Sequence, residues 1–267
     1  MKIKHILGKD LYYHDSSDNV VTALKSGVLF GESGFRLLSG FIKEHGVLLD
    51  VGAHIGTFSL PARHAGFRTI MFEAASLNCE ALRATFGEDV HEGIVSDVVK
   101  KVGFSRDTGP QGWVTDGDEF TTMTIDSVVG DTKIVGIKID IEGSEIEALS
   151  GAESVISRDK PPMVIEVNGF CLMQSGRTCE DLIRKIADLN YLVILPINGH
   201  LVLIDPDKKY PFCNSDVVCI HMDDIGSYRL ENVFSFSDTD LLSIAKKSYD
   251  NSNEDCKNYF NKIYPPR

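Results

Sequence analysis

One strand–loop–helix pattern constrains the fold of this chain more than any other stretch. The apolar run Val47–Leu49 leads into Asp50, and two glycines, Gly52 and Gly56, follow within six positions. Glycine lets a backbone turn tightly and lets a ligand approach it closely. Thr57–Leu60 then opens a helix whose free N–H groups face the same crevice. The pattern predicts the ligand-binding start of a doubly wound α/β domain.

The spacing of the glycines limits which ligand the loop is expected to bind. A dinucleotide-binding loop needs G-x-G-x-x-G, but His54 stands at the third position of that pattern. The observed D-x-G-x-x-x-G instead resembles the motif of methyltransferases that use S-adenosylmethionine (SAM). We therefore expect the loop to bind SAM, and the alternative is a plain tight turn. The predicted loop contacts are Gly52, Ala53, His54, Gly56 and Thr57.

Strand and helix patterns alternate along most of the chain. Strands are expected near 47–51, 69–72, 90–95, 99–104, 120–125, 134–141, 163–167, 191–195 and 216–221, with helices near 56–65, 76–86, 144–156 and 178–189. Such alternation predicts a Rossmann-like, doubly wound, mainly parallel seven-stranded sheet with helices on both faces. We expect an N-terminal segment with a lead-in helix (1–45), a methyltransferase domain (46–222) and a polar, partly helical C-terminal appendage (223–267).

The lead-in helix is expected to stop at Gly46, Ser76 to cap the helix that follows it, and Ser144 to open its helix with a capping box. Asn198-Gly199 predicts a hairpin that ends in a strand at 200–204.

Composition excludes several classes of partner. The 267 residues include 27 basic and 39 acidic side chains, a net charge of -12, so no basic footprint for nucleic acid is evident. No run of about 18 apolar residues predicts a membrane span, and no signal peptide is evident. The six cysteines form neither C-x-x-C pairs nor metal-ligand spacings with histidine, which predicts reduced thiols in a cytoplasmic protein.

Five blocks, in the same order and spacing, resemble the FkbM family of methyltransferases. The most specific are Ile137–Leu149, which is similar to the family's "KIDVEGaE…L" block, and Pro161–Val167, which is similar to "rPpvvlEv". The others are Asp50–Gly56, Phe72-Glu73 with Asn78, and Thr124–Val128. The resemblance covers about residues 30–195 and implies a SAM-dependent methyltransferase. Departures are His54, where asparagine is commoner, and Ala74, where the family usually has proline.

Several residues outside the glycine loop are candidates for SAM binding. Glu73, at the end of the second strand, has the geometry to accept both ribose hydroxyl protons. Ala74 follows it in the same turn. Asp50 is expected either to orient the loop or to hold the methionyl amine. Glu32 matches a glutamate often found in the family, although a surface or capping role is equally consistent with its position.

Acidic residues at two strand ends are the candidate catalytic groups. Asp140 and Glu142 alternate with apolar residues near the end of strand 134–141, together with Lys138, and Glu166 ends the next strand. A Lys138–Asp140 ion pair with Glu142 capping the next helix is the structural alternative. Methyl transfer to a hydroxyl needs a proton acceptor, for which we expect Asp140 first and Glu166 second. Such carboxylates could also hold a divalent ion, but we expect no metal.

The acceptor is expected to be a sugar hydroxyl in a glycan, glycolipid or nucleotide-sugar, with contacts from a polar loop, 105–119, around Trp113. Acidic strand ends suit hydroxyl recognition better than they suit a flipped base. The FkbM resemblance implies O-methylation of sugars or polyketide-type hydroxyls. A small-molecule or carbohydrate substrate is therefore the expected partner. The alternatives are a polyketide or other small hydroxyl compound, a nucleotide-using oxidoreductase, or a catalytically silent SAM-fold binding module.

Overall fold

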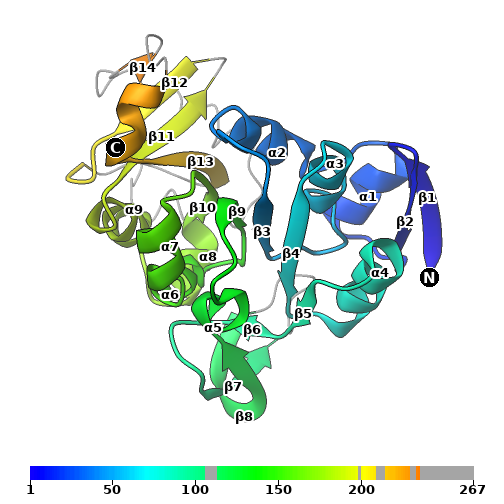
Figure 1. Ribbon diagram of the computed structural model, residues 1–267. Helices are drawn as coiled ribbons and strands as arrows, with labels where there is room; N and C mark the ends of the chain where they lie inside the picture. The colour runs from blue at the N-terminus through cyan, green and yellow to red at the C-terminus, as the bar shows by residue number, and fades with distance from the viewer. Residues whose placement is uncertain (106–112, 198–199, 209–213, 229–232, 235–267) are drawn as a thin grey trace, which may run out of the picture.

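The computed structural model describes residues 1–105, 113–197, 200–208, 214–228 and 233–234, and Figure 1 shows their arrangement. The elements up to the ribbon that projects at the bottom of that view are β1 (Lys2–Ile6), β2 (Lys9–Tyr13), α1 (Asn19–Lys25), α2 (Glu32–Ser39), β3 (Val47–Val51), α3 (Ser59–His64), β4 (Arg68–Glu73), α4 (Ser76–Phe86), β5 (Val90–Glu92), β6 (Ile94–Val95), β7 (Lys101–Ser105) and β8 (Trp113–Met123). The elements that follow are α5 (Ile125–Val129), β9 (Ile134–Ile139), α6 (Glu145–Ser150), α7 (Glu153–Asp159), β10 (Met163–Asn168), α8 (Gly169–Gln174), α9 (Cys179–Asp188), β11 (Tyr191–Ile197), β12 (His200–Ile204), β13 (Asn214–His221), a 3-10 helix (Met222–Ser227) and β14 (Val233–Phe234).

The central sheet contains nine of the described strands, in the order β14-β12-β11-β13-β10-β9-β3-β4-β5. The strands from β10 to β5 run parallel, and β13 is antiparallel to both of its neighbours. The seven strands from β11 to β5 confirm the predicted mainly parallel, doubly wound sheet. β12 and β14 extend its edge beyond the predicted seven, because β12 folds back along β11 and β14 pairs with β12.

Helices cover both faces of this sheet. Leu49 and Val51 of β3 pack into the cluster formed with α5, α6, α7 and α9, whereas Leu48 packs into the cluster formed with α2 and α3. A third apolar cluster joins β2, α1 and α4. The chain continues from β3 into α3 on one face and from β9 into α6 on the other. The carboxyl ends of β3 and β9 therefore flank the point where the winding direction changes, which is where such sheets bind ligands.

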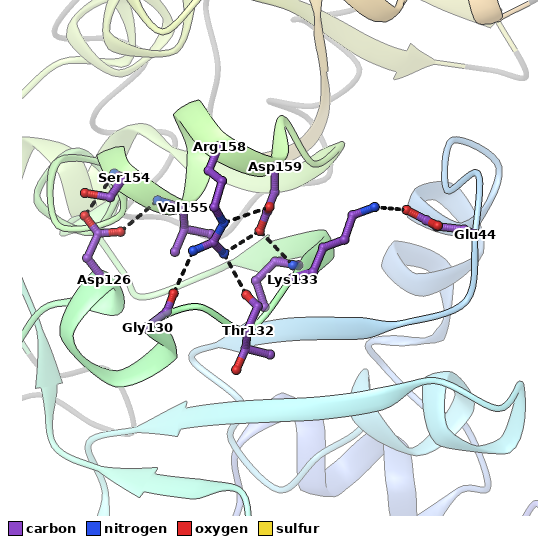
Figure 2. A network of polar contacts seen from close by, with 10 residues as sticks. Glu44, Asp126, Gly130, Thr132, Lys133, Ser154, Val155, Arg158 and Asp159 are labelled. Carbon is purple, nitrogen blue, oxygen red and sulfur yellow. Dashed lines mark hydrogen bonds and ion pairs between the residues drawn. The ribbon is translucent and has the colours of Figure 1, made fainter.

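A polar network fixes the start of β9 (Figure 2). Asp126 accepts hydrogen bonds from the backbone N–H groups of Ser154 (2.9 Å) and Val155 (3.0 Å) and so caps the first turn of α7. Arg158, in the last turn of α7, donates to two carbonyl oxygens of the connection between α5 and β9, each at 2.7 Å. Asp159 accepts from the N–H of Ile134 at 2.8 Å. The network thereby fixes the position of β9 in the sheet, and with it the position of its carboxyl end.

Several predicted boundaries were wrong. The single helix predicted over 144–156 is divided into α6 and α7 at Gly151, where a Cβ atom would lie 2.1 Å from the carbonyl oxygen of Ser96. The lead-in helix ends at Gly40, not at Gly46. Ser76 is the first residue of α4 and not its cap. These differences arise because close approaches between segments, which no local pattern encodes, decide where each helix stops.

The region predicted as a polar loop around Trp113 contains a strand. Residues 113–119 belong to β8, which pairs antiparallel with β7, and residues 106–112 lie outside the described part. The run predicted as strand over 120–125 ends at Met123, and Ile125 begins α5. β6 pairs with the far end of β8 through Ile94 and Thr122. The ribbon formed by β7 and β8 is thus anchored beside the end of β4, because Gly93, next to β6, donates its N–H to the carbonyl oxygen of Glu73 at 2.9 Å.

The C-terminal region is described only in part. β11 and β12 pair as the predicted hairpin, with Ile197 opposite His200, although the turn residues 198–199 lie outside the described part. The helical parts predicted for the appendage also lie outside the described part. The domain boundaries at 45 and 222 stay predictions. None of the helices in the described ranges is both long and apolar enough to cross a bilayer.

Candidate active site

Two glycines shape the loop after β3. Gly52 has φ +82°, and a Cβ atom there would lie 1.8 Å from the carbonyl oxygen of Asp140. Gly56 has φ +87°, and a Cβ atom there would lie 2.3 Å from the ring of Phe86 in α4. Any side chain at Gly52 would push this loop away from the end of β9. The predicted glycine spacing therefore corresponds to two close approaches, one to a neighbouring strand and one to a helix.

The backbone of the loop is tied to the end of β4. Gly52 and Ala53 both donate their N–H groups to the carbonyl oxygen of Phe72, at 2.9 and 3.0 Å. His54 has φ +52° and donates its N–H to Oε2 of Glu73 at 2.8 Å. Its ring Nδ1 is buried without a hydrogen-bond partner among the described residues, and Thr57 is also buried. The structure therefore brings the predicted loop residues together with Glu73.

Glu73 holds its own turn and keeps acceptor capacity. Oε2 accepts from His54, and Oε1 accepts from the N–H of Ala75 at 2.8 Å and from Nδ2 of Asn78 at 3.3 Å. An ionised carboxylate offers about four lone-pair sites, so these three contacts do not exhaust it. Ala74 lies half-buried in the same turn. An acidic acceptor beside a glycine loop at the carboxyl edge of the sheet fits the ribose of SAM.

Asp50 and Glu32, the two remaining candidates for SAM binding, differ in burial: Asp50 is buried and Glu32 is partly exposed. Asp50 is fully buried, and its Oδ2 accepts from the hydroxyl of Ser59 at 2.7 Å. Of its two predicted roles, this burial favours orienting the loop over direct contact with the methionyl amine. Glu32 lies in the first turn of α2 and forms an ion pair with Arg36 at 2.7 Å. That contact corresponds to the surface alternative for Glu32.

Lys138 connects the loop to the acidic end of β9. Its Nζ donates to the carbonyl oxygen of Gly52 at 2.6 Å and lies 3.3 Å from Asp140 and 3.4 Å from Asp50. Burial lowers the pKa of Lys138, but the carboxylates of Asp140 and Asp50 raise it by more, so it lies above its ordinary value. The ammonium therefore stays charged. The predicted Lys138–Asp140 pair is confirmed, and the contacts to Asp50 and Gly52 were not foreseen.

Three carboxylates converge beside this ion pair. Asp140, Glu142 and Glu166 each place an oxygen within 4.8 Å of the other two. Oε2 of Glu166 is buried and has no hydrogen-bond partner in the described part of the chain. Burial first, and then the charges of Asp140 and Glu142, raise the pKa of Glu166 well above its usual range. The acidic cluster predicted from the two strand ends is present, and the absence of a metal there stays a prediction.

The turn after β9 was predicted incorrectly. A capping box was expected at the start of the helix, but Ser144 makes no side-chain cap. Instead, Glu145 accepts hydrogen bonds from the N–H groups of Ile141 and Gly143. Glu142 does not cap that helix either, because its carboxylate accepts from Nδ2 of Asn168 at 3.2 Å and from the thiol of Cys171 at 2.8 Å.

The sequence did not identify Asn168 or Cys171 as neighbours of the site. Asn168 ends β10, two positions after Glu166, so period-two alternation placed both on one face of the strand. Cys171 lies in α8, where Asn168 also caps the helix by accepting from the N–H of Cys171 at 3.3 Å. Burial raises the pKa of the Cys171 thiol, and Glu142 raises it further, so the thiol stays protonated and donates. The helix was not predicted, and nothing in the local pattern marks this contact.

Comparison with known proteins assigns the family. The methyltransferase FkbM domain family matches residues 50–193, more than half of the chain. The chain therefore belongs to the FkbM methyltransferase family, and its cofactor is SAM. No curated protein matches the chain.

Three similar solved structures are distant in sequence. An FkbM methyltransferase from Methylobacillus flagellatus is 22% identical with a TM-score of 0.45, and the match covers 68% of this chain and 46% of that one. The magnesium protoporphyrin IX methyltransferase of Synechocystis, with bound SAM, is 12% identical with a TM-score of 0.43, covering 78% and 87%. The glycopeptide N-methyltransferase MtfA, complexed with SAM, is 12% identical with a TM-score of 0.40, covering 72% and 94%. The chain thus spans less than half the length of the Methylobacillus protein.

Replacing Glu73 with alanine tests the ribose contact. We expect the affinity for SAM to fall by about 1.5–3 kcal/mol, because the variant loses a charge-assisted acceptor and the anchor of the His54 N–H. Calorimetric titration with SAM measures the change, and circular dichroism checks the fold. Glu92→Ala, at the end of the neighbouring strand β5, is the matched control and should bind normally. Unchanged affinity in folded Glu73→Ala would rule out the assignment.

Proposed function

We propose that this chain transfers the methyl group of SAM to a sugar hydroxyl in a glycan, glycolipid or nucleotide-sugar. The observation that carries the proposal is the convergence of Asp140, Glu142 and Glu166 beside the glycine loop. SAM supplies an electrophilic methyl group, and a hydroxyl becomes an adequate nucleophile only when a base takes its proton. A carboxylate cluster next to the cofactor loop supplies that base and can hold the hydroxyl in line with the transferred methyl.

Within this proposal, Asp140 is the first candidate for the base. Its side chain is 37% exposed, so an acceptor can reach it, and its carbonyl oxygen lies against Gly52. Asp140 therefore borders both the cofactor loop and the acidic cluster, which also makes it a candidate for contacting SAM. Glu166 is the second candidate, because its raised pKa brings it closer to the neutral range in which a base works best. Glu142, held by Asn168 and Cys171, is the third member.

For the cofactor, we propose that Glu73 holds the ribose and that the loop from Gly52 to Thr57 lines the methionyl side. Ala74 lies beside the ribose contact, Asp50 orients the loop, and Glu32 at the start of α2 is the outermost candidate. The glycine conformations and the spare acceptor capacity of Glu73 support this arrangement.

The net charge of -12 and the acidic cluster favour an uncharged, hydroxyl-rich acceptor over nucleic acid. The exposed stretch of β8 that includes Asp118 and Glu119, on the ribbon anchored beside Glu73, is where we expect sugar contacts. The side chain of Trp113, the other predicted contact, lies outside the described part. A polyketide or other small hydroxyl compound is the alternative acceptor, and a silent SAM-binding module is the alternative role. Among the described residues, Cys79, Cys171 and Cys219 form no disulfide, which favours the proposed reducing, cytoplasmic location.

Methyl-labelled SAM identifies the acceptor. The protein is incubated with labelled SAM and a panel of UDP-, GDP- and dTDP-sugars, simple glycosides, polyketide alcohols, RNA and protein extract. We expect label in the sugar fraction, in a form that resists the mild base that cleaves methyl esters. Label in RNA or on protein side chains, with none in the sugars, contradicts the proposed acceptor. SAM binding without label in any fraction supports the silent module.

Charge-neutral substitutions test the base. Asp140→Asn should lower turnover by about 100-fold or more while SAM affinity stays near normal, because general-base catalysis typically contributes that much. Glu166→Gln is the parallel variant, and Glu88→Gln, at an exposed position between α4 and β5, is a control for loss of acidic charge away from the cluster. Steady-state rates and calorimetric SAM affinities are measured for each. The assignment of the base fails if both Asp140→Asn and Glu166→Gln retain full activity.

A further inference from the structure

The turn between β9 and α6 adopts a conformation that few sequences favour. Glu142 has φ +55° and Gly143 has φ +102°. A Cβ atom on Gly143 would lie 2.4 Å from the carbonyl oxygen of Cys171, and the hydroxyl of Ser175 donates to the carbonyl oxygen of Gly143 at 2.6 Å. Only glycine lets the turn pack this closely on α8. Because Asp140 and Glu142 lie in this turn, its conformation decides where their carboxylates point.

Glu145 lies beneath the turn and is completely buried. Its Oε1 accepts from the N–H of Ile141 at 3.2 Å and from the N–H of Gly143 at 3.0 Å. Its Oε2 lies 3.1 Å from the same Gly143 nitrogen. Backbone N–H groups that converge in this way form a concavity for an anion. Here the anion is a side chain of the protein itself.

We propose that Glu145 is a positioning residue for methyl transfer. Its carboxylate organises the turn that aims Asp140 and Glu142 at the acceptor, without touching the acceptor itself. The inference rests on the proposed catalytic role of those two carboxylates. It assigns a function to a buried acid that neither binds SAM nor belongs to the cluster of three converging oxygens.

The charge of Glu145 changes near neutral pH. The pKa of Glu145 is raised to about 7. Burial is the largest cause, the N–H groups of the turn lower the pKa in part, and the charge of Asp140 raises it. The other titratable groups that interact with it are Glu166 on β10 and Cys171 on α8, and Glu142 lies on the same turn. The carboxylate anion accepts hydrogen bonds through both oxygens, whereas the acid form places a proton on one of them. The turn is therefore held more firmly above pH 7 than below it.

The substitution Glu145→Gln tests this role through its pH dependence. Glutamine resembles the protonated acid in shape and charge: its carbonyl oxygen still accepts a hydrogen bond, but its NH2 group cannot accept one. Rates with labelled SAM and the nucleotide-sugar panel are measured from about pH 5.5 to about pH 8.5, around the shifted pKa. We expect turnover about tenfold below wild type at the alkaline end, converging toward wild type at the acidic end. The affinity for SAM should change by less than about twofold, since its proposed ribose contact lies on β4.

A second readout does not depend on the acceptor. Amide hydrogen exchange of Ile141 and Gly143, corrected for intrinsic rates, should be about tenfold faster in Glu145→Gln than in wild type at alkaline pH. Glu147→Gln is the matched control in the same helix, because the Glu147 carboxylate pairs with Arg177 at 2.9 Å, whereas the N–H groups of Ile141 and Gly143 donate to Glu145. It should leave both readouts unchanged.

Three outcomes overturn the inference: a turnover deficit that is the same at every pH, no deficit at any pH, or unchanged amide exchange in Glu145→Gln. A constant deficit would indicate a purely structural role. If wild-type protein methylates no sugar, the proposed function fails on its own. The exchange measurement still decides whether Glu145 holds the turn, and unchanged exchange would then reject the inference.

Discussion

The buried ammonium of Lys138 is the contact on which the rest of the site depends. It reaches the carboxylates of Asp50 and Asp140 and the carbonyl oxygen of Gly52, so a single charge joins β3, its loop and the end of β9. Asp50 is fully buried, and its carboxylate would cost several kcal/mol without a charged partner. Lys138 offsets part of that cost. The same contact holds the cofactor loop and the candidate base at a fixed separation.

Around this ion pair, the carboxyl edge of the sheet divides into two halves. On the β3–β4 side, Glu73 binds backbone N–H groups of the loop and keeps spare acceptor capacity, which suits a ribose. On the β9–β10 side, carboxylates converge and raise the pKa of Glu166, which suits proton transfer. Gly52 lies where the halves meet, with no room for a side chain against Asp140. The proposed cofactor site and the proposed catalytic cluster therefore share one boundary at Gly52.

Local patterns predicted the parts of this arrangement that repeat along the chain. The alternation of strands and helices and the charged face of strand 134–141 were sufficient for the mainly parallel sheet and the Lys138–Asp140 pair, and the five similar blocks indicated the FkbM family. Asp50 and Lys138 could have been paired as well, because they occupy matching positions in adjacent parallel strands. That step requires the strand order, which the family resemblance implied but the residues alone did not.

The features that were missed depend on contacts between distant segments. The break at Gly151 comes from its approach to Ser96, and the role of Glu145 comes from a turn that folds back over its side chain. The sequence Ser144-Glu145-Ile146-Glu147 fits a capping box equally well, so the pattern could not reveal that Glu145 is buried. The first part of β8, residues 113–119, was predicted as a loop because its polar, glycine-containing sequence resembles one. Tertiary packing, and not local preference, decides each case.

A double-mutant cycle on Lys138 and Asp50 tests the central claim most directly. The free energy of unfolding in urea is measured for Lys138→Met, Asp50→Asn, the double variant and wild type. Lys138→Met alone should cost about 3 kcal/mol or more, because it leaves the fully buried carboxylate of Asp50 without its ion pair. The double variant should cost at least about 1 kcal/mol less than the two single losses added together. Additive losses would show that Lys138 and Asp50 act independently, and would contradict the account of a shared ion pair holding the site.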